Sequence, residues 1–188
     1  MRRSVTLRSE LDPAALVILE GAQGALLDRD HGEHPWVTPS RISRRAAHDA
    51  LTTLGLGDAP STCWGVLRAY FTRHGAGPFP TEDQELTRAL PEPHNTHGPW
   101  QGAMRVGWFD AVLARRAIEI AGPIDRLAIT CLDRLDALPE VRLRTATGWQ
   151  TSASGLPYLE HLEAALDRSI DLVSRGPAAG DKVARVRC

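Results

Sequence analysis

The sequence predicts an α/β protein in which a mostly parallel sheet carries flanking helices. Short apolar runs of strand length alternate with longer segments whose apolar residues recur at helical spacing, and this alternation is typical of α/β folds. The strand-like runs end in small or polar residues, and ligands of open α/β sheets bind at that end of the strands. The segments that support this prediction are strands at 14–19, 127–130 and 170–173, and helices at 110–120 and 157–168.

The first of these strands ends in the turn Gly21-Ala22-Gln23-Gly24. The small side chains of this turn leave room for a ligand. Gln23 can both donate and accept hydrogen bonds, which suits it to the edge of a flat heterocycle. The alternative is an ordinary strand-to-helix turn with an exposed glutamine. We therefore treat the turn as a candidate ligand site.

Two polar segments follow the turn. Residues 28–34 hold two aspartates and two histidines, which either converge on a metal ion or simply lie in a loop. A second histidine pair at 94–97 is a weaker example of the same pattern. Residues 35–49 carry arginines between serines, which fits either a phosphate-binding loop or a solvated surface. We expect loops without a metal ion at both histidine pairs.

Residues 64–72 place apolar side chains at helical spacing, so we predict a packed helix that leads into a glycine- and proline-containing loop at 75–80. The two glycines of this loop permit close approach of the backbone to a ligand, and its two prolines stiffen it. Residues 82–106 are predicted to be mostly irregular. Connections of that length are uncommon unless they are functional or mobile.

The second half of the sequence supplies the remaining elements. The helix predicted at 110–120 stops at Gly122-Pro123, and a strand at 127–130 follows. Alternating residues at 140–147 predict a half-exposed strand, and Ser154 is a candidate N-cap for the last helix. Polar segments follow two of the predicted strands, at Cys131 to Asp133 and at Ser174 to Pro177.

Composition limits the possible functions. The chain has 188 residues, 43% of them hydrophobic and 24% charged, which is enough for one packed domain. We expect that domain at 14–177, between a flexible lead-in at 1–13 and a flexible tail at 178–188. A net charge of −1 argues against nucleic acid or an anionic membrane as a partner. Three widely spaced cysteines and no long apolar run fit a reducing cytoplasm.

Six blocks of sequence occur in a fixed order along the chain. They are the segments at 19–38, 65–73, 75–82, 107–110, 130–133 and 174–177. The longest uninterrupted one is Gly75-Ala76-Gly77-Pro78-Phe79-Pro80-Thr81-Glu82. Together the blocks resemble the adenylosuccinate synthetase family. The resemblance covers roughly residues 15–177 and corresponds to the C-terminal part of the family's usual polypeptide.

The resemblance implies a P-loop-NTPase-like adenylosuccinate synthetase fold and a ligase of purine nucleotide metabolism. In that family GTP, with Mg²⁺, phosphorylates the 6-oxygen of inosine monophosphate, and the aspartate amine then displaces the phosphate. The family's glycine-rich phosphate loop has no counterpart in this sequence. We therefore expect no catalytic residue and no metal ligand in this chain. The phosphate chemistry and the Mg²⁺ ligands would belong to a separate chain in a homo- or hetero-oligomer, and this chain alone would be inactive.

The resemblance also implies binding residues for each ligand. The purine nucleotide would be held by Gln23, Gly24, Thr38, His74 and Gly75, the acceptor loop would keep Arg105, and GTP would be held by Asp133, Ser174 and Gly176. From the residues alone, Asp133 could equally be a helix N-cap or a turn residue.

Three departures from the family pattern leave two hypotheses open. Cys131 stands where the family has the lysine that packs along guanine, His74 replaces a small apolar residue, and Arg105 alone remains of an arginine cluster that holds aspartate. One hypothesis is a component of a carbon–nitrogen ligase that uses a different acceptor or amine. The other is a catalytically degenerate purine-nucleotide-binding or regulatory module.

Overall fold

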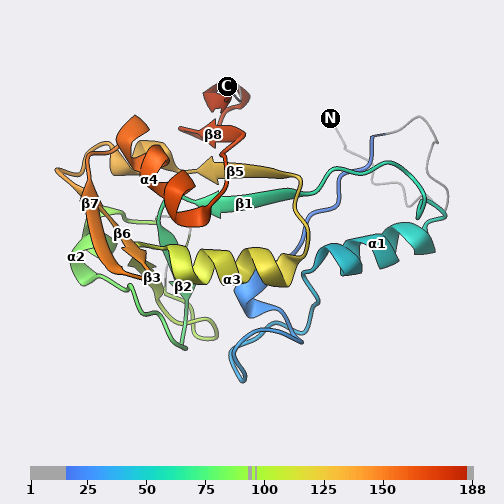
Figure 1. Cartoon of the computed structure of the whole chain (residues 1–188). Coiled ribbons are helices and arrows are strands. Elements are labelled where there is room, and N and C mark those ends of the chain that lie inside the picture. Colours follow the sequence, from blue (N-terminus) through green and yellow to red (C-terminus); the bar gives the residue numbers. More distant parts are fainter. Residues whose placement is uncertain (1–15, 93–94, 96, 186–188) are drawn as a thin grey trace, which may run out of the picture.

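The computed structural model describes residues 16–92, 95 and 97–185, and it confirms the predicted α/β class (Figure 1). Its central sheet has four strands in the order β1-β5-β8-β9. β5 pairs in parallel with both β1 and β8, and β9 lies antiparallel at the far edge. These strands are β1 (Trp64–Arg68), β5 (Arg126–Thr130), β8 (Leu172–Ser174) and β9 (Lys182–Ala184).

Two smaller sheets complete the strand inventory. One is the antiparallel pair β2 (Phe71–His74) and β3 (Met104–Gly107), and the other has the order β4 (Phe109–Asp110), β6 (Val141–Thr145) and β7 (Gly148–Ser152). The α-helices are α1 (Arg44–Thr53), α2 (Gln84–Ala89), α3 (Ala111–Ala121) and α4 (Leu156–Leu166). Short 3₁₀ helices are η1 (Ala25–Leu27), η2 (Leu132–Leu135) and η3 (Ala179–Asp181).

The core includes one face of the central sheet and the helices α3 and α4. Leu127 and Ile129 of β5 are almost fully buried, and α3 packs against both α4 and β1. Burying an aliphatic side chain of this size contributes about 1.5–3 kcal/mol. The Tyr158 hydroxyl, on α4, donates to the Ala69 carbonyl at 2.8 Å. This bond holds α4 against the end of β1.

The helix predicted at 110–120 is confirmed as α3, and the predicted stop at Gly122 is confirmed as well. Asp110 is the N-cap and accepts hydrogen bonds from the N–H groups of Val112 and Leu113. Gly122, at a φ of 87°, ends the helix. The Asp110 carboxylate is fully buried and pairs with Arg144 at 2.6 Å. Oδ1 of Asp110 caps α3 and Oδ2 pairs with Arg144 of β6, so this one carboxylate links the helix to β6.

The strand predicted at 14–19 is wrong. Residues 16–19 form no strand in the structure, and Leu16 and Ile18 are 88% and 81% exposed. An apolar run becomes a strand only when a neighbouring strand pairs with its backbone. The described part of the chain provides no such neighbour for these residues. The turn at Gln23 therefore does not lie at the end of a sheet strand.

The helix predicted at 64–72 is also wrong, because these residues form β1 and the start of β2. Apolar residues in a short run fit a helix and a buried strand equally well. Pairing with β5 along its whole length decides the outcome, with Val66 opposite Ala128. Between the two strands, Ala69 and Tyr70 are fully buried.

Several smaller predictions need correction or lie outside the described residues. The segment 82–106, predicted to be mostly irregular, contains α2 and β3, and the tail at 178–188 contains η3 and β9. Gly155, not Ser154, occupies the N-cap of α4. The lead-in at 1–13 lies outside the described residues. The other predicted strands and the last helix are confirmed to within three residues. Within the described ranges, no helix has the length and apolarity needed to cross a bilayer.

Candidate functional site

The carboxyl ends of β1, β5 and β8 meet at one edge of the central sheet, because the three strands are parallel. Ligands of α/β sheets bind at such an edge. Here it collects the polar segments that follow β5 and β8, including three predicted site residues: Asp133, Ser174 and Gly176. The structure therefore brings the expected GTP-binding residues to a common edge.

Asp133 lies in η2, directly after β5, and its side chain is half-buried. Its carboxylate has no hydrogen bond or ion pair to any residue that the structure describes. Cys131 precedes it with a φ of 61°, in the left-handed region. Among non-glycine residues this backbone conformation is uncommon and often accompanies function. Asp133 thus presents an open acceptor at the edge of the sheet.

Ser174 and Gly176 form a closed turn at the end of β8. The Ser174 hydroxyl donates to the Gly176 carbonyl at 3.0 Å, and Lys182 Nζ donates to the same carbonyl at 2.7 Å. A Cβ at position 176 would come 2.4 Å from Asp181 Oδ2, so only glycine fits without rearrangement. Ser174 is almost fully buried, and its hydroxyl oxygen still has accepting capacity.

Sequence reasoning missed Arg68, the last residue of β1. Its guanidinium pairs with Glu92 at 3.1 Å, and the Tyr70 hydroxyl donates to the same carboxylate oxygen at 3.0 Å. Burial on its own would lower the pKa of Arg68, but interactions with Cys131, Tyr70 and Glu92 raise it. The Arg68 cation therefore interacts with Cys131, the residue that stands where the resemblance places a lysine. The sequence signal that was available is an arginine two residues before a tyrosine, within the block at 65–73.

A second group of predicted residues lies in the loop around η1, which packs against α3. Gln23 is exposed and has a φ of 63°, and Gly24 is the N-cap of η1. Leu27 links this turn to Thr38, because its N–H donates to Gly24 and its carbonyl accepts from Thr38, both at 2.8 Å. Gly24 and Thr38 therefore belong to one hydrogen-bonded unit, and Gln23 directly precedes Gly24.

Asp28 organises this loop and was not identified from the sequence as doing so. It is 1% exposed, and its carboxylate accepts from the backbone N–H groups of Asp30, His31 and Ile42 and lies 3.0 Å from His31 Nδ1. Burial would raise the pKa of Asp28, but the hydrogen bonds, above all that from Ile42, lower it to about 2. A fully charged carboxylate thus fixes the shape of residues 28–42.

His74 and Gly75 end β2. His74 Nε2 is buried and has no hydrogen-bond partner among the described residues. Gly75 has a φ of 78°, and a Cβ there would come 2.4 Å from the Gln101 carbonyl oxygen. Burial and the nearby charge of Arg105 lower the pKa of the neighbouring Arg73, and the charge of Glu33 raises it in part. Glu33 lies in the η1 loop, so this influence shows that β2 and that loop are near each other.

Arg105 does not present a free guanidinium. Nε and Nη2 bind the Glu82 carboxylate, and Nη1 donates to the carbonyls of Gly75 and Gly77 at 2.9 and 3.0 Å. Its guanidinium also lies over the Phe79 ring, 5.4 Å from the centroid. Arg105 therefore holds the glycine loop at 75–80 in place. It has little donor capacity left for a carboxylate substrate.

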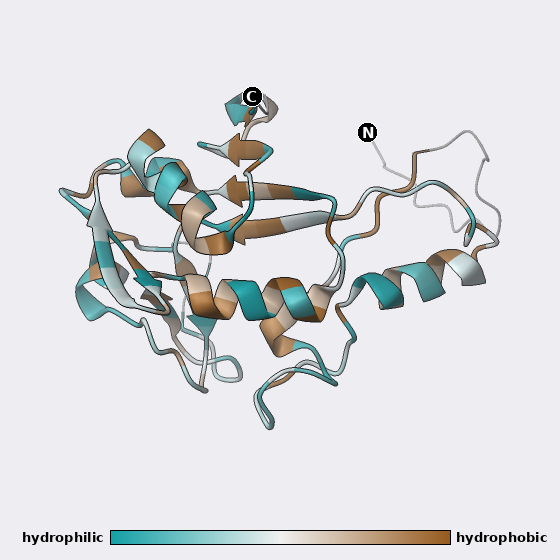
Figure 2. Ribbon diagram, in the orientation of Figure 1, coloured by the Kyte–Doolittle hydropathy of each residue, from teal (hydrophilic) through white to brown (hydrophobic). Residues whose placement is uncertain are grey.

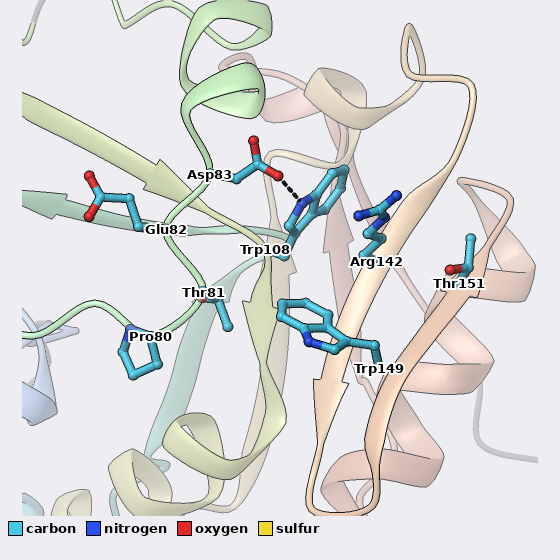
Figure 3. Close-up of a pocket in the computed structure, with 8 residues that line it drawn as sticks. All are labelled: Pro80, Thr81, Glu82, Asp83, Trp108, Arg142, Trp149 and Thr151. Atoms are coloured by element: carbon cyan, nitrogen blue, oxygen red, sulfur yellow. Dashed lines mark hydrogen bonds between the residues drawn. The ribbon is translucent and has the colours of Figure 1, made fainter.

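A pocket of about 410 Å³ lies elsewhere, between the loop at 80–83 and the β6–β7 hairpin (Figure 3). Trp108 and Trp149 contribute indole rings to it, and Trp108 Nε1 donates to Asp83 at 2.8 Å. None of the predicted site residues lines this pocket. Across the described ranges, no group of three or more His, Cys, Asp or Glu side chains could hold a metal ion. His94 lies outside those ranges.

A family profile described as adenylosuccinate synthetase matches residues 1–153. The adenylosuccinate synthetase of Desulforamulus reducens is 43% identical over 145 residues, which are 74% of this chain and 32% of that protein. That of Azotobacter vinelandii is 34% identical over 213 residues, covering 90% of this chain and 48% of the relative. This chain thus spans about a third to a half of the relatives' length.

Two solved structures share the fold. The fully ligated adenylosuccinate synthetase of Plasmodium falciparum superimposes with a TM-score of 0.73 at 24% identity, over 89% of this chain and 49% of that one. Cyanophage S-2L succinoaminodeoxyadenylate synthetase, bound to dGMP and to dATP as an energy donor, gives a TM-score of 0.60 at 20% identity. That match covers 87% of this chain and 45% of the phage protein.

Proposed function

Because this chain belongs to the adenylosuccinate synthetase family, we propose that it is the nucleotide-binding part of a GTP-dependent carbon–nitrogen ligase. In this proposal it binds a purine nucleotide and GTP in the cytoplasm, and a separate chain performs the phosphate chemistry with Mg²⁺. The sequence has no glycine-rich phosphate loop, and the described residues offer no metal-binding group. In the family that the sequence resembles, such a loop handles the phosphate, and the proposal assigns this task to a separate chain.

The observation that carries the proposal is the carboxylate of Asp133, which has no partner among the described residues and lies at the carboxyl edge of the parallel strands. Guanine has adjacent ring and exocyclic N–H donors, and one carboxylate can accept from both. Adenine has no such pair of donors. A half-buried carboxylate with no partner in the described structure is costly unless water or a ligand satisfies it. Asp133 therefore favours guanine as the base that binds at this edge.

The other residues would orient the ligands. The Ser174 hydroxyl, directed at the Gly176 carbonyl, could accept a hydrogen bond from the guanine side of the site. Gln23 would bind the edge of the acceptor purine, and His74 Nε2 would gain the partner that it lacks in the described structure. Mg²⁺, when bound, would neutralise the charge of the transferred phosphate. This chain's residues hold the two bases in position for that transfer.

The amine is proposed to differ from aspartate. A dicarboxylate needs cations with free donors, and each charge-assisted hydrogen bond contributes about 1.5–3 kcal/mol. Arg105 already binds Glu82 and two loop carbonyls. The expected cluster is therefore reduced to one engaged arginine, which weakens the case for an acidic amino acid as the substrate.

The second candidate function is a purine-nucleotide-binding or regulatory module without chemistry. The engagement of Arg105 and the presence of Cys131 in place of lysine both favour it. The two candidates agree on nucleotide binding and differ on turnover, so separate measurements test them.

A thermal-shift titration tests nucleotide binding. We expect GTP and inosine monophosphate each to raise the melting temperature, since a ligand at about 100 times its Kd adds about 2.7 kcal/mol of stability. ATP, dGMP and dATP serve as comparison nucleotides, the last two because the phage relative binds them. If no purine nucleotide shifts the melting temperature, both candidate functions are refuted.

Turnover separates the ligase from the module. The chain would be mixed with the phosphate-loop part of a family member, and phosphate release from GTP measured with and without an added amine. Amine-dependent release supports the ligase. Nucleotide binding without release, across aspartate and neutral amino acids, supports the module.

A further inference from the structure

A cavity that has no part in the proposed function lies between the loop at 80–83 and the β6–β7 hairpin (Figure 3). Its volume of about 410 Å³ is at the lower end of the range for small-molecule sites, which is about 300–1,000 Å³. Two indole rings and three charged side chains contribute to its walls. They belong to Trp108, Trp149, Glu82, Asp83 and Arg142. Apolar surface with a few charged groups is typical of a site for one small ligand.

The two indoles provide a surface for an aromatic ring. Trp149 is 54% exposed, and it is the only large apolar side chain on β7, a strand that Figure 2 shows as pale or hydrophilic. Trp108 is partly buried, and its Nε1 donates to Asp83 at 2.8 Å, so its ring is held in place. Within the described part of the chain, neither indole pairs with another aromatic ring. Aromatic rings attract one another in offset or edge-to-face arrangements, so a flat ring in the cavity would gain these contacts.

Asp83 supplies a negative charge to the cavity. Burial would raise the pKa of its carboxyl, but hydrogen bonds from Leu86, Trp108 and Glu85 and the charge of Arg142 lower it. Asp83 is therefore ionised at neutral pH. Its Oδ1 accepts from two backbone N–H groups, whereas Oδ2 accepts from Trp108 alone among the described residues. Oδ2 thus keeps a lone pair for an ammonium donor.

Arg142 supplies a positive charge and a donor that no described residue uses. Its Nε and Nη2 donate to Glu140 at 3.0 and 2.9 Å, and Nη1 has no hydrogen bond to a residue in the described ranges. The charge of Arg142 acts on Asp83, yet the two side chains form no ion pair with each other in the described structure. They are therefore near each other but separated. A ligand that carries both an ammonium and a carboxylate group would bind both.

Thr81 forms part of the same walls. It is 2% exposed, and its Oγ1 has no hydrogen-bond partner among the residues that the structure describes. A buried hydroxyl without a partner is unfavourable. A polar ligand in the cavity is one source of the missing hydrogen bond.

We propose that this cavity binds a free amino acid with an aromatic side chain. Asp83 accepts from its ammonium group, Nη1 of Arg142 donates to its carboxylate, and its ring lies against the two indoles. A ligand with a single charge is disfavoured, because Arg142 repels a cation and Asp83 repels an anion. None of the residues expected to bind nucleotides lines this cavity, so amino-acid binding here does not depend on the proposed function.

A charge-matched series of ligands tests this site on the full chain. L-Phenylalanine carries both charges, phenethylamine carries only the ammonium group, and 3-phenylpropionate carries only the carboxylate. Isothermal titration calorimetry or saturation-transfer NMR would measure their affinities for the wild-type chain, Trp149→Ala and Arg142→Gln. Trp100→Ala is the control, because Trp100 is 94% exposed and does not line the cavity. Circular dichroism would verify that each variant is folded.

We expect L-phenylalanine to bind the wild-type chain and the control with a Kd of about 1 mM or lower, and each singly charged compound to bind at least about tenfold more weakly. Trp149→Ala should weaken phenylalanine binding about tenfold. Arg142→Gln should remove the preference for phenylalanine over phenethylamine.

Two results would overturn the assignment of an amino-acid site. One is the absence of phenylalanine binding to the wild-type chain at concentrations up to about 10 mM, or binding that Trp149→Ala leaves unchanged. The other is phenethylamine binding as tightly as phenylalanine, which would identify a site for a cation instead.

Discussion

Replacing Asp28 by asparagine should destabilise the η1 loop by an amount that the structure allows one to calculate. The folded pKa of about 2 lies below the ordinary value of 3.8. At about 1.36 kcal/mol per pKa unit, this difference corresponds to about 2 kcal/mol of stabilisation at neutral pH. Asparagine removes the charge, and its amide group places a donor among backbone donors such as that of Ile42. The expected loss is therefore about 2–3 kcal/mol.

The dependence on pH distinguishes this mechanism from a simple packing defect. Because the folded pKa of Asp28 is lower than the unfolded one, its contribution is complete above pH 3.8 and disappears as the pH falls toward 2. Urea unfolding, together with amide exchange at His31 and Ile42, would measure the difference between wild type and variant across that range. Asp49→Asn is the control, because Asp49 is exposed on α1 and its side chain has no hydrogen bond or ion pair to any described residue. A difference that stays constant from about pH 5 to about pH 2 would refute the reasoning.

Three further predictions concern the candidate sites. Asp133→Asn should weaken GTP binding by about tenfold or more and leave the melting temperature of the free chain unchanged, with the exposed Asp58→Asn as the control; unchanged preference for GTP over ATP in calorimetry would remove Asp133 from the site. Gln23→Ala should weaken inosine monophosphate binding without unfolding the chain, because Gln23 is exposed; equal affinity in the same titration would contradict this role. Gly75→Ala should lower the free energy of unfolding by about 1–3 kcal/mol, and by more than Gly55→Ala, which shares the positive φ but has open space around it; equal losses in urea unfolding would show that contact with Gln101 is unimportant.

The elements predicted correctly are those with strong local signals. The predicted helix begins at Asp110 and stops at Gly122, and in the structure these two residues flank α3. The apolar run at 127–130 that follows was predicted as a strand and forms β5. Residues 16–19 and 64–72 were predicted wrongly for a common reason. A short apolar run does not specify whether a strand will pair with it, and pairing involves residues far away along the chain.

The candidate sites show the same limit. The residues proposed to bind GTP could be placed at one edge, because each follows a predicted strand and parallel strands end together. The roles of Asp28 and Arg105 could not be predicted, since both depend on hydrogen bonds to backbone groups of distant loops. Asp28 resembled a metal ligand in the sequence, but in the structure its carboxylate binds backbone N–H groups.

The order of strands in the central sheet has a consequence for biosynthesis. β1 is made early, but its partner β5 begins at residue 126, and β8 ends at residue 174. The hydroxyl of Tyr158, which holds the end of β1, comes from a residue 89 positions after its acceptor Ala69. A ribosome-bound chain that ends before β5 therefore exposes both edges of an apolar strand. Such unpaired strands are prone to aggregation, so translation speed and early chaperone contact would affect the yield of this protein.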